Sequence, residues 1–189
     1  MTVKVITAPA AALSLEQLRR HCKIDPPTSA NDADTDLSAA LAAARATCEH
    51  HTGTSIGQQT LELALAAFPE AGIPLPRGPV TSITSVTYLD AAGASQVLSS
   101  GAYRLNDYVT PQELLPAVGT EWPATFDDVN AVKIRYVAGA TTLDGAVAQA
   151  LRLLAGLYFD NRNAADKGAL TEIPYGVQVL LNTVKDWSR

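Results

Sequence analysis

Aspartates at alternate positions within Asn31–Asp36 form a pattern in this chain that could bind a metal. The same alternation occurs in calcium-binding loops, which also need glycine at the sixth loop position and glutamate at the twelfth. Leu37 and Ala43 stand at those two positions, so the calcium interpretation fails. We interpret the aspartates as residues just before a helix, where acidic groups cap free amides and complement the helix dipole.

A second arrangement of metal-binding side chains is the run Cys48-Glu49-His50-His51, which ends a predicted helix. Cys48 and His51 are one helical turn apart and would share a face. A zinc site needs more ligands, and His21 is the only histidine outside this run. We therefore predict no metal site, with Cys48 in the core and the histidines favoured by the helix dipole.

Motifs for catalysis are absent from the sequence. It has no Gly-x-Gly spacing, which a dinucleotide or phosphate loop would need, and no Gly-x-Ser-x-Gly elbow. Asp127 and Asp128 are adjacent in a predicted loop, where such residues are usually solvated turn formers. We predict a chain that is not an enzyme and has no cofactor. A small ligand-binding or hydrolytic module that uses a cleft in the β region stays open as an alternative.

Length and composition suit one soluble domain, residues 1–189, with 47% hydrophobic residues and a net charge of −5. A mildly acidic chain is poorly suited to grip nucleic acid through its phosphates. The only cysteines, Cys22 and Cys48, are predicted to be reduced thiols. The chain start lacks a signal peptide, and no apolar run approaches the roughly 20 residues that span a bilayer. We predict no membrane partner and synthesis in the cytosol.

The order of sequence patterns is helices, then strands, then helices. Helices are predicted over about 14–53 and 144–187, and Ser14 with Gln17 forms a capping box at the first. Between them, about 57–138 alternates apolar and polar residues in short runs joined by turns. These connections are too short for helical crossovers, so the strands should pair antiparallel. The predicted fold class is α+β, mainly a bundle of about four helices with an inserted antiparallel β region.

The stretch 130–162 organises this layout. Its first half alternates as a half-buried strand over 132–137, and its second half has a helical period. The polar or minimal positions of that helix lie three or four apart and form one narrow stripe: Gly145, Gln149, Arg152, Gly156 and Asp160. Nearly every other position is apolar, so the helix should be wetted on one side only. It is expected to be central to the core, shared with a neighbouring subunit, or both.

Some positions are candidates for contact with a subunit or partner. Glycine at position 156 lowers the stability of the helix by roughly 1 kcal/mol relative to alanine. It indicates either a neutral substitution that the protein tolerates or the close approach of another element. Arg162 either contacts a partner or complements the helix C-terminus. Trp187 either folds back or anchors a partner. The complete predicted set is Gln149, Arg152, Gly156, Tyr158, Asp160, Asn161, Arg162 and Trp187.

An ordered set of weak motifs resembles the head–tail connector (adaptor) proteins of tailed bacteriophages. The set covers roughly Leu13 to Leu181 and has these parts: Leu75-Pro76-Arg77-Gly78-Pro79-Val80, a Gly-containing hairpin after Tyr88, Trp122-Pro123, Val132 to Gly139, Tyr158 to Arg162, and Ile173-Pro174-Tyr175-Gly176-Val177. Their order and spacing carry the resemblance, because each motif alone is unspecific.

The resemblance implies a structural virion protein at the head–tail junction, assembled in the host bacterial cytoplasm. It implies a ring of about twelve copies, joined through heterologous interfaces, beneath the portal protein. Such a ring contacts a tail or head-completion protein and extends the channel through which double-stranded DNA passes without specific binding. The runner-up functions are other ring-forming virion proteins, namely a head-completion or a tail-terminator protein.

Overall fold

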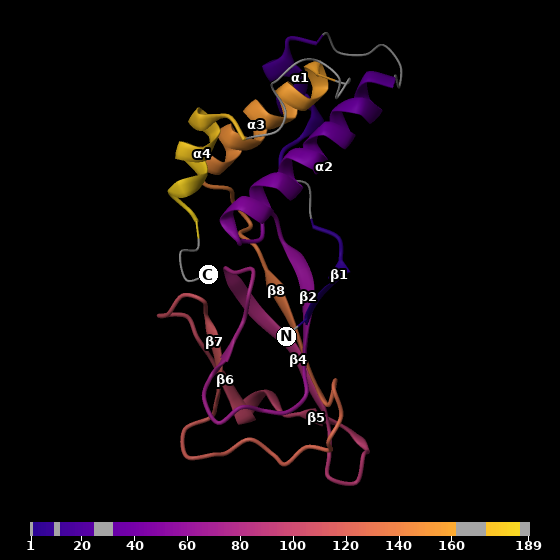
Figure 1. The fold of residues 1–189 in the computed structure, drawn as a ribbon, viewed down its shortest axis with the longest axis vertical. Coiled ribbons are helices and arrows are strands. Elements are labelled where there is room, and N and C mark those ends of the chain that lie inside the picture. Colours follow the sequence, from indigo (N-terminus) through magenta and orange to yellow (C-terminus); the bar gives the residue numbers. More distant parts are fainter. Residues whose placement is uncertain (1, 10–11, 25–31, 162–172, 186–189) are drawn as a thin grey trace. The chain divides into compact units, whose positions relative to one another are not determined.

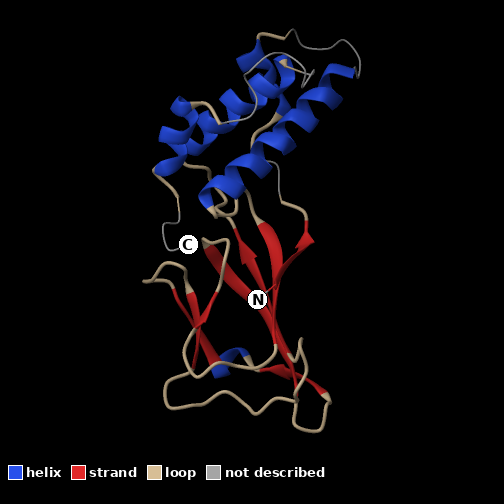
Figure 2. Cartoon of the chain, viewed as in Figure 1, coloured by secondary structure: helices blue, strands red, loops and turns tan. Residues whose placement is uncertain are grey.

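The computed structural model describes residues 2–9, 12–24, 32–161 and 173–185, which divide into two compact units. The helical unit comprises Ala11–Ile56 and Thr142–Lys185, and the β unit comprises Met1–Ala10, Gly57–Thr141 and Asp186–Arg189. Figure 2 shows this separation of helices from strands, which is the predicted α+β class. That the chain is a single domain stays a prediction.

The helical unit contains α1 (Leu15–Cys22), α2 (Asp32–Thr52), α3 (Gly145–Asp160) and α4 (Tyr175–Asn182) (Figure 1). Helix α3 packs against each of the other three. The predicted capping box is confirmed, because the Ser14 hydroxyl accepts from the Gln17 amide and the Gln17 side chain accepts from the Ser14 amide. Leu18, Leu37, Leu151, Leu154 and Leu181 are all fully or almost fully buried in the unit's core.

Two helix boundaries differ from the prediction. Helix α2 begins at Asp32, so the aspartates of Asn31–Asp36 lie mainly inside its first turn and not before it. Acidic side chains are favoured by the dipole throughout that turn, which the pattern alone could not resolve. Helix α4 ends at Asn182, earlier than the predicted limit near 187, and residues 186–189 lie outside the described ranges.

The β unit contains a five-stranded sheet in the order β1-β2-β8-β4-β5 and a three-stranded sheet in the order β3-β7-β6. The strands are β1 (Thr2–Thr7), β2 (Gln59–Leu65), β3 (Ile73–Pro74), β4 (Val80–Leu89), β5 (Ser95–Leu98), β6 (Tyr103–Asn106), β7 (Glu113–Pro116) and β8 (Val132–Ala138), and a 3-10 turn, η1 (Ser100–Ala102), precedes β6. Every pairing is antiparallel, as predicted.

Strand β8 lies at the centre of the larger sheet, between β2 and β4. Its alternation is confirmed: Val132, Ile134 and Tyr136 are buried, whereas Lys133 is exposed and Arg135 is half-buried. The register places Leu61 opposite Tyr136 and Leu63 opposite Ile134, so apolar side chains of both strands enter one core. The edge strand of this sheet is β1, which pairs with β2.

Candidate subunit and partner interface

Helix α3 buries a wider part of its surface than the single apolar stripe of an ordinary surface helix. Its buried residues are Val147, Ala150, Leu151, Leu154, Ala155 and Gly156. They pack with residues of α1, α2 and α4 in one hydrophobic cluster. The expected core role of this helix is therefore confirmed, and contact with other molecules is restricted to what remains exposed.

Gln149 and Arg152 lie on the part of α3 that solvent reaches. Both are half-buried, and Leu153 beside them is 38% exposed. Arg152 makes no hydrogen bond or ion pair with any described residue. The region therefore offers a cation and an apolar side chain to an incoming surface, a pairing often found at protein interfaces.

Gly156 is buried within the helical unit and contacts α1. A methyl group built on it would lie 3.6 Å from His21 Cδ2 and 3.8 Å from Cys22 Sγ, which are ordinary van der Waals distances. Helix α1 thus covers the polar stripe of α3 at Gly156, so the stripe is not exposed to solvent along its whole length. The close approach of another element is real, but packing within the unit leaves room for alanine here.

The C-terminal end of α3 carries polar groups that are mostly satisfied locally. The Tyr158 hydroxyl lies 3.1 Å from Thr47 Oγ1 on α2. The backbone amide of Asn161 and its side-chain Nδ2 both donate to the Leu157 carbonyl, at 3.0 and 2.9 Å. Asp160 is exposed. It follows the Gln149–Leu153 region along α3 by about two helical turns, so the predicted residues form a line and not one cluster.

The cysteines of the helical unit have raised pKa values. Burial, and secondarily the negative charge of Asp160, raises the pKa of the Cys22 thiol. Burial, followed by the charge of Glu49, raises the pKa of Cys48 to about 12. Neutral thiols are poor nucleophiles and poor metal ligands. Cys48 is a core residue, as predicted, and His51 Nε2 lies 3.2 Å from Asn182 Oδ1.

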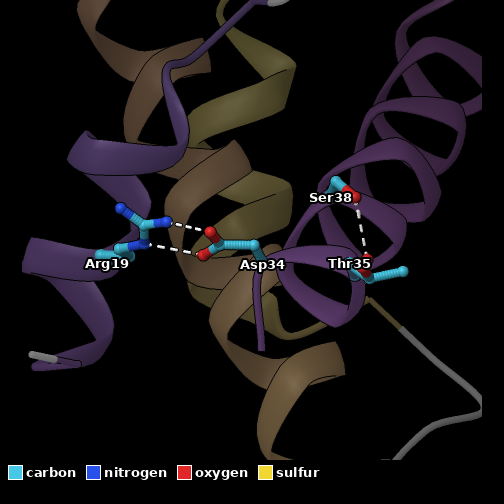
Figure 3. A network of polar contacts seen from close by, with 4 residues as sticks. All are labelled: Arg19, Asp34, Thr35 and Ser38. Carbon is cyan, nitrogen blue, oxygen red and sulfur yellow. Dashed lines mark hydrogen bonds and ion pairs between the residues drawn. The ribbon is translucent and has the colours of Figure 1, made fainter. Parts of the chain in front are cut away.

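An ion pair joins α1 to the start of α2 (Figure 3). Arg19 Nε donates to Asp34 Oδ1 at 2.8 Å, and Arg19 Nη2 donates to Asp34 Oδ2. Both side chains are mostly shielded from solvent. The Arg19 hydrogen bonds hold the pKa of Asp34 below its usual value. The aspartate run is therefore partly engaged in packing between helices.

The solvent-exposed side of α2 carries only small, uncharged side chains over more than three turns. The exposed residues between positions 34 and 48 of α2 are Thr35, Ser38, Ala39, Ala42, Ala43 and Ala46. The Ser38 hydroxyl donates to the Thr35 carbonyl at 2.8 Å, so it presents little free polarity (Figure 3). We call these residues the α2 outer face. Small side chains let another backbone approach closely.

Large apolar side chains that sequence reasoning missed are exposed in both units. On α4, Tyr175 is 80% and Val179 is 48% exposed, one turn apart. In the β unit, Tyr108 is 96% exposed in the turn between β6 and β7, and Val118 and Val129 are also well exposed. Single exposed apolar residues are common. The loop positions of Tyr108, Val118 and Val129 carried no periodic signal that could have identified them.

Over the ranges that the structure describes, His, Cys, Asp and Glu form no group of three that could hold a metal ion. Over the same ranges, no helix has both the length and the apolar character of a membrane span. Arg162 and Trp187 lie outside the described residues.

Comparisons with known proteins show that the chain is similar to components of a phage-like particle. No protein-family model matches it, and no curated protein matches it. Among solved structures, a chain in the virion of a native gene transfer agent (GTA) particle is 28% identical, with a TM-score of 0.77. A chain in the neck of an empty GTA particle, computed with C6 symmetry, is 27% identical with a TM-score of 0.78. A chain in the neck of a native GTA particle, computed with C12 symmetry, is 28% identical with a TM-score of 0.76.

Each of these matches covers 98% of this chain and 95% of the other. Both units, with the connections between them, are therefore included in the likeness. Over nearly its whole length, the chain is similar in fold and sequence to chains of the gene transfer agent particle, two of them described from its neck.

Proposed function

We propose that this chain is a structural head–tail connector (adaptor) of a tailed-phage-like particle. About twelve copies form a ring beneath the portal, join the capsid to the tail, and extend the DNA channel. The observation that carries the proposal is the full-length likeness to chains of a particle neck, one of which comes from a neck computed with C12 symmetry. The protein acts in the virion after assembly in the host bacterial cytoplasm, and it is not an enzyme.

A cyclic ring requires that one face of each subunit meet a different face of the next. In the helical unit, the α2 outer face is a suitable first partner because it is uncharged, lacks long side chains and is exposed. Gln149, Arg152 and Leu153 on α3, or Tyr175 and Val179 on α4, supply the larger side chains of a second face. Alanine has no rotamer freedom to lose on burial, so the α2 outer face itself adds little entropic cost to such a contact.

Residues at the end of α3 remain proposed contacts with the portal or with the next neck protein. Asp160 is exposed, and Tyr158 and Asn161 are held in fixed positions by their hydrogen bonds. Arg162 and Trp187 belong to the same proposal. Gly156 is excluded from it because α1 of the same chain covers it.

The acidic net charge suits a channel through which DNA must slide. A subunit with a charge of −5 offers few phosphate-neutralising contacts, and such contacts make DNA binding strong. Double-stranded DNA is therefore a passing partner and not a bound ligand.

Electron microscopy of the purified chain, alone and mixed with the portal protein of its own genome, tests the proposal. We expect closed rings or portals decorated with an additional ring. Decoration of a tail tube, with no binding to portals, would support a tail-terminator role. Binding only to a portal already carrying another adaptor would support a head-completion role. The absence of any ring or decoration under all four conditions, namely the chain alone, with portals, with tail tubes and with adaptor-carrying portals, would contradict a neck function.

A further inference from the structure

The β unit contains a cavity of about 500 Å³ that belongs to none of the faces proposed for the ring. Its lining includes Phe68, Glu70, Pro116, Glu121, Trp122 and Pro123. These residues come from the segment after β2, the end of β7 and the long connection that leads to β8. Two segments that are distant in sequence, the one after β2 and the one that runs from the end of β7 toward β8, thus form a single depression rich in aromatic and proline residues.

Stacked aromatic rings form one wall of this cavity. Phe68 and Trp122 lie face to face, with ring centroids 4.7 Å apart and ring planes 5° apart. Tyr88 of β4 contacts Phe68 edge-on, with centroids 5.8 Å apart. Phe68 therefore contacts Trp122 with its ring face and Tyr88 edge-on. Both Phe68 and Trp122 are half-buried, so the wall is not sealed from solvent.

The bonding of Trp122 is incomplete in the free subunit. Its indole nitrogen is buried and has no hydrogen-bond partner among the described residues. A buried donor without an acceptor is costly, and native proteins rarely leave one unpaired. Residues 121–126 form no helix or strand, so a small shift of this segment can bring the donor to an acceptor on a ligand.

The charge of the cavity is negative only. Glu70 and Glu121 are exposed at its lining, and neither makes a hydrogen bond or ion pair with a described residue. Among the residues that the structure describes, no lysine, arginine or histidine lines it. Aromatic rings beside free carboxylates are complementary to a guanidinium group, which stacks on the ring and pairs with the carboxylate. The exposed turn around Tyr108 of a second copy would be a poor occupant of the cavity, because Asp107 in that turn adds a negative charge beside the carboxylates.

We propose that this cavity binds an extended segment of a partner protein through an arginine side chain. The guanidinium stacks on the aromatic wall and pairs with Glu121 and Glu70, while a backbone carbonyl of the segment accepts from the Trp122 indole. The proposal goes beyond the ring function, and its test does not depend on ring formation.

The test uses the full chain with Trp187→Phe, which leaves Trp122 as the only tryptophan. The probe is the blocked peptide Ala-Pro-Arg-Pro-Ala, and its matched control carries neutral citrulline in place of arginine. Binding is followed by the indole N–H resonance and by tryptophan fluorescence. We expect saturable binding of the arginine peptide, a shifted indole resonance, and at least about tenfold weaker binding of the citrulline peptide.

Substitutions at exposed positions identify the carboxylates without disturbing the fold. Glu121→Gln and Glu70→Gln should each weaken binding several-fold, and Asp127→Asn should leave it unchanged, because Asp127 is exposed and does not line the cavity. Equal binding of both peptides, or no effect of either glutamine variant, would overturn the proposal. Concentration-dependent shifts of the indole resonance without peptide would also overturn it, by identifying a second copy of the chain as the occupant.

Discussion

Gly139, at the end of β8, lies so close to the carbonyl group of Gly57 that a methyl group on Gly139 would overlap with it. Gly139 also has a φ of 98°, which side chains rarely tolerate. Its amide donates to the Pro79 carbonyl at 2.8 Å, so the backbone cannot move freely away. This contact fixes the point at which the central strand ends.

We predict that Gly139→Ala lowers the free energy of unfolding by about 2 kcal/mol or more, because strain in φ and steric overlap add. Chemical denaturation measures the change. Gly101→Ala is the matched control, since nothing lies within 4 Å of its added methyl group, and it should cost far less. Equal losses in the two variants would contradict the close approach.

The opposite result is expected for Gly156, although it is also buried. Gly156→Ala should raise the free energy of unfolding by up to about 1 kcal/mol, because alanine favours the helix and its methyl group fits against α1. Gly156→Leu should lower it by about 1–3 kcal/mol through overpacking. A destabilised alanine variant would show that α1 lies closer to α3 than this structure has it.

The Arg19–Asp34 ion pair predicts a dependence of stability on pH. The pKa of Asp34 is lower in the folded chain than in the unfolded chain, where it is near 3.9. The unfolded state therefore takes up a proton first, so the stabilisation is present above about pH 4 and is lost as the pH falls further. Asp34→Asn should be less stable than the wild type at pH 7, and the difference should shrink toward pH 2.

Glu16→Gln is the control for that experiment. Glu16 pairs with Arg20 on the same helix, but the side chains are 68% and 75% exposed. Exposed pairs contribute little, so this variant should follow the wild type at every pH. If Asp34→Asn and Glu16→Gln behaved alike, the shielded ion pair between α1 and α2 would not hold in solution.

If the α2 outer face contacts the next subunit, a substitution there should impair ring assembly without changing the stability of the subunit. Ala42→Glu should change the free energy of unfolding by no more than about 0.5 kcal/mol, because position 42 is exposed. It should nevertheless abolish rings or portal decoration, since an unpaired carboxylate would be buried between subunits. Ala66→Glu, at an exposed position of the β unit, is the control. Normal rings formed by Ala42→Glu would remove α2 from the interface.

Much of the backbone could be predicted because local patterns determined it. Ser14 and Gln17 identified the start of α1, and the alternation of Leu61 and Leu63 identified β2. The limits of α2 were harder, because acidic residues are favourable both before a helix and in its first turn. The burial of Gly156 could not be predicted, since it depends on where α1 crosses α3.

The candidate surfaces were mostly beyond reach of the sequence. Ala39, Ala42 and Ala46 were recognisable as helix formers, but only the packing of the other helices determines which side of α2 stays exposed. Phe68 and Trp122 are distant in sequence, and their stacking arises from tertiary contacts between loops. Loops have no period from which such a meeting could be inferred.

Counting the copies of this chain on each portal assembly decides whether it forms a connector ring there. Native mass spectrometry of the portal saturated with this chain gives that number without labels. We expect a single mass increment of twelve copies, in accordance with the C12 symmetry of the neck in which the similar chain was found. Portals that gain no mass, or that gain a continuous distribution of small numbers of copies, would contradict it.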